Sequence, residues 1–63
     1  MWEVSYIAAQ SASGLRQDEQ VVAVEVSNPI TAIHRALVEQ RESNWFLRVM
    51  ADEISVSVRR ADA

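Results

Sequence analysis

Two segments near the start of the chain alternate between apolar and polar positions. Residues 20–27 carry valines at every second position, and valine favours strands. Successive side chains of a strand point to opposite faces, so residues 2–9 and 20–27 are both predicted to be half-buried strands. Gly14, the only glycine, lies between them and indicates a turn, because glycine adopts positive φ without steric cost. The side chains that share one side of the first segment are Trp2, Val4, Tyr6 and Ala8.

A helix is predicted directly after the second strand. Asn28 can accept a hydrogen bond from the first helical turn, and the fixed φ of Pro29 suits the first helical position. Apolar residues then recur at three- and four-residue spacing, which indicates an amphipathic helix over residues 29–42. Ser43 and Asn44 are expected to end it, since Asn tolerates the left-handed conformation common at helix ends. The expected inward-facing set is Ile30, Ile33, Ala36, Leu37 and Gln40.

The last part of the chain is predicted to be strand. Residues 45–50 are mostly apolar, and residues 54–59 alternate cleanly between apolar and polar side chains. Residues 51–53 contain neither Gly nor Pro, so two interpretations stay open. The segment forms either two short strands joined by a tight turn or one long kinked strand.

The order β-β-α-β predicts an α+β fold: a small antiparallel sheet of three to four strands with one helix packed on one face. A crossover through the helix places the third strand beside the first, which becomes central and antiparallel to both neighbours. Residues 1–63 are expected to form a single domain, because so short a chain supports one core. The expected core is Trp2, Val4, Tyr6, Val22, Val24, Val26, Ile33, Leu37, Trp45 or Phe46, Leu47, Val49, Ile54, Val56 and Val58.

Composition narrows the class of protein. Hydrophobic residues make up 49% and charged residues 24%, as in ordinary folded domains. The net charge of −3 lacks the basic excess that supplies affinity for phosphates, so nucleic acid is a disfavoured partner. The absence of Cys excludes disulfides and thiolate metal sites. No apolar run reaches membrane-spanning length and the start lacks signal-peptide features, so we expect a cytoplasmic protein with no membrane partner.

Candidate chemistry is sparse. His34 is the only side chain whose ordinary pKa lies near neutrality, and Val38 one turn later leaves it without a helical metal-binding partner. The paired carboxylates fall in predicted loops and on the helix surface, where solvation explains them. A single glycine cannot form a glycine-rich phosphate loop. The sequence therefore assigns no catalytic or metal-binding residue and no cofactor, and it favours a non-enzymatic role.

The sheet face turned away from the helix supplies the candidate binding residues. Apolar side chains there alternate with polar ones, and small sheets with an uncovered face and free edges commonly pair with another chain. We expect a homo-oligomer or a complex with a protein partner, formed through this face or a strand edge. A one-residue shift in residues 45–50 would exchange Phe46 for Trp45. The candidate protein-binding residues are Ile7, Val21, Ala23, Phe46, Arg48 and Met50.

The chain also resembles a group of viral proteins. Its opening run is Glu3-Val4-Ser5-Tyr6-Ile7, its valine-rich second strand leads through Asn28-Pro29 into Ala32-Ile33-His34-Arg35-Ala36-Leu37, and it closes on Ile54-Ser55-Val56-Ser57-Val58-Arg59-Arg60. In size and order this is similar to the small β-β-α-β accessory proteins of bacteriophages, including anti-CRISPR and other anti-defence proteins. The likeness covers most of the chain and includes no diagnostic motif, so it transfers no functional residue.

This resemblance implies a phage-encoded inhibitor in the host cytoplasm that occludes the surface of a host defence protein. The alternative is a minor structural component of the capsid or tail, whose partner would be a virion protein. A small enzyme with a site across an oligomer interface is the least favoured class.

Overall fold

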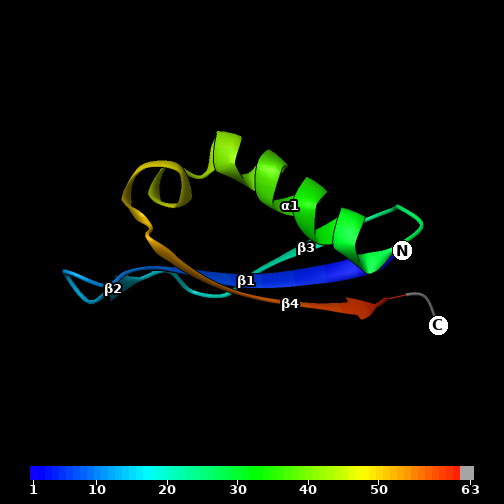
Figure 1. Cartoon of the computed structure of the whole chain (residues 1–63), viewed down its shortest axis with the longest axis horizontal. Helices are drawn as coiled ribbons and strands as arrows, with labels where there is room; N and C mark the ends of the chain where they lie inside the picture. Colours follow the sequence, from blue (N-terminus) through cyan, green and yellow to red (C-terminus); the bar gives the residue numbers. More distant parts are fainter. Residues whose placement is uncertain (62–63) are drawn as a thin grey trace.

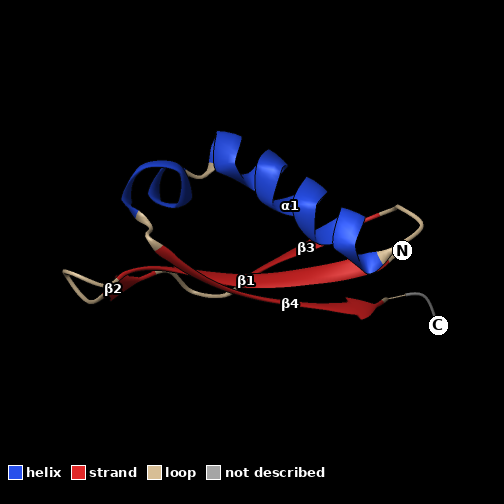
Figure 2. Cartoon of the chain, in the orientation of Figure 1, coloured by secondary structure: helices blue, strands red, loops and turns tan. Residues whose placement is uncertain are grey.

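The computed structural model describes residues 1–61 and confirms an α+β fold of β-β-α-β order (Figure 1). The sheet is antiparallel throughout, and α1 and η1 lie on the same side of it (Figure 2). In chain order the elements are β1 (Trp2–Gln10), β2 (Leu15–Arg16), β3 (Gln20–Val24), α1 (Pro29–Ser43), the π-helical turn η1 (Phe46–Met50) and β4 (Glu53–Arg60).

The first strand is central, as the crossover through the helix predicted. β4 pairs with one side of β1 along nearly its whole length, with Trp2 opposite Arg60. β3 and the short β2 share the other side of β1. The turn before β2 contains Gly14 at φ +75°, the left-handed conformation for which glycine is suited. The connection between the first two predicted strands thus adds a short pairing at the far end of the sheet.

The helix packs on one face through small side chains. Asn28 Oδ1 accepts from the Thr31 backbone N–H at 2.8 Å, which confirms the predicted start of α1. Ala32 and Ala36 are fully buried against the sheet, because alanine has no atoms beyond Cβ and lets the helix approach closely. The buried apolar residues are Val4, Tyr6, Ala8, Val24, Ala32 and Ala36.

The predicted strand over residues 45–50 is wrong. Asn44 Oδ1 accepts from the Leu47 backbone N–H at 3.1 Å, and the Ala51 N–H donates to the Phe46 carbonyl at 2.9 Å. These bonds close a π-helical turn in place of a strand. The final strand is consequently neither split nor kinked, and it begins at Glu53. Asn44 ends α1 as expected, but at φ −108° it is extended and not left-handed.

Several side chains expected inside the core are exposed. Trp45 and Val49 follow the helical turn outward, each 57% exposed, and Ile54 on β4 is 39% exposed. Ile30 is 75% exposed because it lies about 120° around the helix from Ala36, at roughly 100° per residue. The sequence pattern predicted that large apolar residues of the helix face inward, whereas the fully buried residues of α1 are alanines.

Candidate protein-binding surface

The sheet face opposite α1 is uncovered by any other part of residues 1–61 (Figure 2). Its side chains have the opposite phase to the buried Val4, Tyr6 and Ala8 of β1, since successive residues of a strand point to opposite faces. Cross-strand partners share a face, so the register extends this assignment to the neighbouring strands. We call this surface the uncovered face: Glu3, Ser5, Ile7, Ala9, Arg16, Val21, Ala23, Glu53, Ser55, Ser57 and Arg59.

The uncovered face has an apolar half and a polar half. Ile7 and Ala9 are half-buried on the central strand, while Val21 and Ala23 are exposed on β3. Val21 lies opposite Ser5, two residues before Ile7 on β1, which makes Val21 and Ile7 diagonal neighbours. β4 contributes only polar side chains to this face. Ile7, Val21 and Ala23 therefore form an apolar strip that crosses diagonally from β1 to β3. Glu3 and Ser5 of β1 lie beside its β3 end, and the polar side chains of β4 lie beside Ile7.

Charged side chains stand at both ends of the face. At one end Arg59 Nη2 lies 2.8 Å from Glu3 Oε1, across the register pair that joins β4 to β1. The Arg59 side chain is 77% exposed, so this pair contributes only about 0–1 kcal/mol to stability. At the other end Arg16 and Glu53 both stand opposite Ala9. The charges balance, and their arrangement is suited to orienting a partner.

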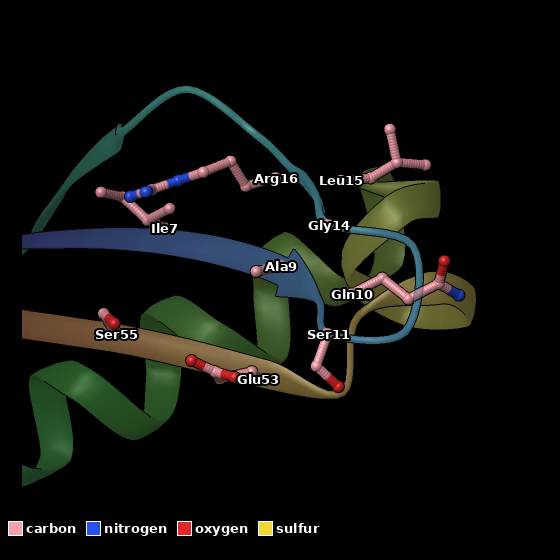
Figure 3. Close-up of a pocket in the computed structure, with 9 residues that line it drawn as sticks. All are labelled: Ile7, Ala9, Gln10, Ser11, Gly14, Leu15, Arg16, Glu53 and Ser55. Carbon is pink, nitrogen blue, oxygen red and sulfur yellow. The ribbon is translucent and has the colours of Figure 1, made fainter.

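A shallow depression of about 230 Å³ occupies the Arg16 end of the face (Figure 3). Figure 3 shows Glu53 and Ser55 extending from β4 and Arg16 from the opposite side, with α1 behind the sheet. A second depression of about 150 Å³ shares Ile7 and Ser55 with the first. Both are smaller than the roughly 300–1,000 Å³ typical of small-molecule sites. The first is lined by Ile7, Ala9, Gln10, Ser11, Gly14, Leu15, Arg16, Glu53 and Ser55.

The structure brings together only half of the predicted binding residues. Ile7, Val21 and Ala23 lie on the uncovered face as expected. The placement of Phe46, Arg48 and Met50 on that face is wrong, because residues 46–50 form η1 on the side of the sheet that carries α1.

Within η1 the three misplaced residues have different environments. Phe46 and Met50 are half-buried, and Arg48 is exposed with its Nη1 donating to the Glu42 carbonyl at 2.9 Å. A sequence signal for this turn exists in Asn44, since Asn caps helical turns as readily as it ends them.

The helical side carries an apolar surface that sequence reasoning missed. Val38, Trp45 and Val49 are exposed there, and Val38 lines a depression of about 260 Å³ together with Arg48. The other residues around that depression are Arg41 and Glu42, whose aliphatic stems add to the apolar lining beside Val38. Exposed apolar side chains therefore occur both on the helical side and on the uncovered face.

One carboxyl group has a clearly perturbed pKa. The Ser11 backbone N–H donates to Asp52 Oδ1 and the Ser11 hydroxyl donates to Oδ2, each at 3.0 Å, and these bonds lower the pKa of Asp52. Asp52 N–H donates in turn to the Ala9 carbonyl at 3.0 Å. The group fastens the start of β4 to the end of β1, which is a structural role.

Within residues 1–61, no cluster of three or more His, Asp or Glu side chains is placed to hold a metal ion. The same part of the chain contains no helix with the length and apolar character needed to cross a membrane. No protein-family model matches the sequence, and neither a curated protein nor a solved structure matches it significantly. The surface itself is therefore the basis for inferring function.

Proposed function

We propose that this chain is a non-enzymatic protein-binding domain whose contact surface is the uncovered face. The observation that carries the proposal is the apolar strip of Ile7, Val21 and Ala23 on a sheet face that residues 1–61 leave open. Burying such a strip against a partner removes apolar surface from water, which is the main favourable term in protein association.

The layout of the face supports a protein partner over a small molecule. Protein interfaces combine an apolar centre with a polar, charged rim, and here Arg59 and Arg16 stand at opposite ends of the strip. The depression around Ile7 is shallow and could accept one side chain of a partner. The net charge of −3 favours a partner with a basic surface, because opposite potentials steer association.

A domain that offers only a surface acts by covering a site on its partner. The resemblance to phage accessory proteins makes a host defence protein the favoured partner and inhibition by occlusion the favoured mechanism. A structural role in a phage particle is the second candidate. The outer edge of β4, which is unpaired within residues 1–61, favours it because open edges suit assembly. Detection of the chain in purified particles would distinguish that role.

The test uses an affinity-tagged chain, chemical cross-linking in host lysate and two matched Ile→Glu variants. Ile7→Glu places a charge in the apolar strip, whereas Ile30→Glu makes the same change on the exposed side of α1. We expect the unmodified chain and Ile30→Glu to retain the same protein, with cross-links to the uncovered face, and Ile7→Glu to lose it. Circular dichroism checks that both variants fold.

Two outcomes contradict the proposal. Retention of the partner by a folded Ile7→Glu variant would move the contact away from the uncovered face. Failure of the unmodified chain to bind any protein specifically would count against a protein-binding role altogether.

A further inference from the structure

The outer side of β4 is a long unpaired strand edge. β4 runs over Glu53–Arg60 and pairs only with β1 in the described part of the chain. The opposite edge of the sheet is shared by the short β3 and β2, with residues 17–19 interrupting it. Proteins protect such edges with proline, bulges or inward charges, and the centre of β4, Ile54 to Val58, has none of these.

The register shows which backbone groups face outward. The Ala61 N–H donates to the Met1 carbonyl at 3.1 Å, which continues the pairing of Trp2 with Arg60. Hydrogen-bonded and non-hydrogen-bonded pairs alternate along an antiparallel ladder, so the odd-numbered residues of β4 bond to β1. The N–H and C=O groups of Ile54, Val56 and Val58 consequently point away from the sheet.

We propose that a second copy of this chain pairs antiparallel with this edge, β4 against β4, with Val56 opposite itself on a two-fold axis. Outward groups must meet outward groups, so only even-numbered residues can form the hydrogen-bonded pairs between the copies. The two-fold axis must therefore pass through a residue and not between two residues. The three positions nearest the middle of the segment Ile54 to Val58 are Ser55, Val56 and Ser57. Moving the axis by one residue shifts the pairing by two residues. Each of the three registers therefore places different side chains opposite each other.

The Val56-centred register gives the best complementarity. On the uncovered face, Glu53 of each copy lies opposite Arg59 of the other copy. On the helical face, Ile54 of each copy lies opposite Val58 of the other copy. Arg59 contacts Glu3 through Nε and Nη2, which leaves other guanidinium donors for the second copy. Centring on Ser57 would place Arg59 opposite Ser55 and Arg60 opposite Ile54, and centring on Ser55 would leave Arg59 beyond the partner strand.

The pairing also covers apolar surface that the single chain leaves open. Ile54 is 39% exposed, and the Val58 of a second copy would pack beside it. The two α1 helices would lie on the same side of the joined sheet. Three strand spacings of about 4.8 Å separate the two β1 strands by roughly 14 Å, more than the 8–10 Å between packed helices. The helices therefore leave room for the pairing.

The first experiment determines the register with single cysteines, which the chain otherwise lacks. In the proposed dimer the two Val56 Cα atoms lie about 5.5 Å apart, within the range a disulfide can bridge. Residues 55 and 57 lie farther from their own copies, at roughly 8 Å, beyond that range. Under mild oxidation Val56→Cys should form more disulfide-linked dimer than Ser55→Cys or Ser57→Cys. A larger yield from either control would overturn the Val56 register.

The second experiment exchanges charges across the interface. Glu53→Arg removes no side-chain hydrogen bond or ion pair within residues 1–61 but places two Arg–Arg pairs in the dimer, so sedimentation should show dimerisation weakened roughly tenfold. Adding Arg59→Glu restores opposite charges between the copies and should recover part of the affinity, because it also replaces the Arg59–Glu3 ion pair within each chain by two carboxylates. Circular dichroism checks the fold of both. Unchanged dimerisation in Glu53→Arg would exclude this contact.

The dimer does not depend on the proposed function, and the two can fail separately. Ile7→Glu alters the uncovered face and leaves the β4 edge intact, so it should leave dimerisation unchanged. A chain that sediments as a monomer at concentrations up to about 1 mM, the weak end of specific affinities, overturns the dimer whatever the partner assay shows.

Discussion

Asn44 and Gln17 exchange two hydrogen bonds between their side-chain amides. Asn44 Nδ2 donates to Gln17 Oε1 at 2.9 Å, and Gln17 Nε2 donates to Asn44 Oδ1 at 3.0 Å. Asn44 Nδ2 also donates to the hydroxyl of the buried Tyr6, which donates to Gln40 Oε1. Asn44 therefore joins β1, the loop before β3, the end of α1 and the start of η1.

Removing the half-buried Asn44 side chain should destabilise the domain. Asn44→Ala leaves the Tyr6 hydroxyl, the Leu47 N–H and the Gln17 amide each short of a partner, at an expected cost of roughly 1–3 kcal/mol. Asn44→Asp keeps an accepting oxygen, so its free energy of unfolding should lie between those of the unmodified chain and Asn44→Ala. Urea denaturation measures both, and an unchanged midpoint in Asn44→Ala would show that the network is not stabilising.

The start of α1 should depend on its capping side chain. Asn28→Ala removes the acceptor 2.8 Å from the Thr31 N–H and should cost about 1 kcal/mol in the free energy of unfolding. Asn28→Ser supplies another capping oxygen and serves as the matched control. Thermal denaturation of both variants checks the prediction, which fails if both have the same melting temperature as the unmodified chain.

Acid should weaken the link between β1 and β4. The backbone N–H and hydroxyl of Ser11 hold the pKa of Asp52 below its usual 3.8, so the folded state binds this proton less readily than the unfolded state. The stabilisation is therefore fully present above about pH 4 and is lost as the pH falls through the lowered pKa.

Carboxyl ¹³C NMR titration measures this effect directly. Ser11→Ala removes the hydroxyl donor and should raise the pKa of Asp52 toward the usual value, while the remaining backbone bond keeps it partly lowered. Ser13→Ala is the control, since the Ser13 hydroxyl bonds to Gln10. Equal titration of the two variants would contradict the assignment.

The close approach of α1 to the sheet should resist enlargement. Ala32→Leu inserts a branched side chain at a fully buried contact and should cost roughly 1–3 kcal/mol through strain. Ala23→Leu makes the same change at an exposed position and should alter stability by no more than about 0.5 kcal/mol. Denaturant unfolding compares them, and a tolerated Ala32→Leu would mean that the helix can move outward at little cost.

The uncovered face shows how far local pattern reasoning extends. Ile7, Val21 and Ala23 were placed correctly because two clear strands fix which side chains share a face. Phe46, Arg48 and Met50 were misplaced because an apolar run satisfies a strand and a helical turn equally well. The free edge of β4 followed from strand order, but its outward backbone groups could be assigned only from the register.

The sequence by itself determined the features that depend on neighbouring residues. The period-two patterns specified β1, β3 and most of β4, and Asn28 with Pro29 specified where α1 begins, because these signals act within one strand or one helical turn. The tertiary structure decided what depends on distant residues. Residues 46–50 form a turn alongside an Asn44 that Tyr6 and Gln17 hold in place, and α1 buries its alanines because they allow the closest contact with the sheet.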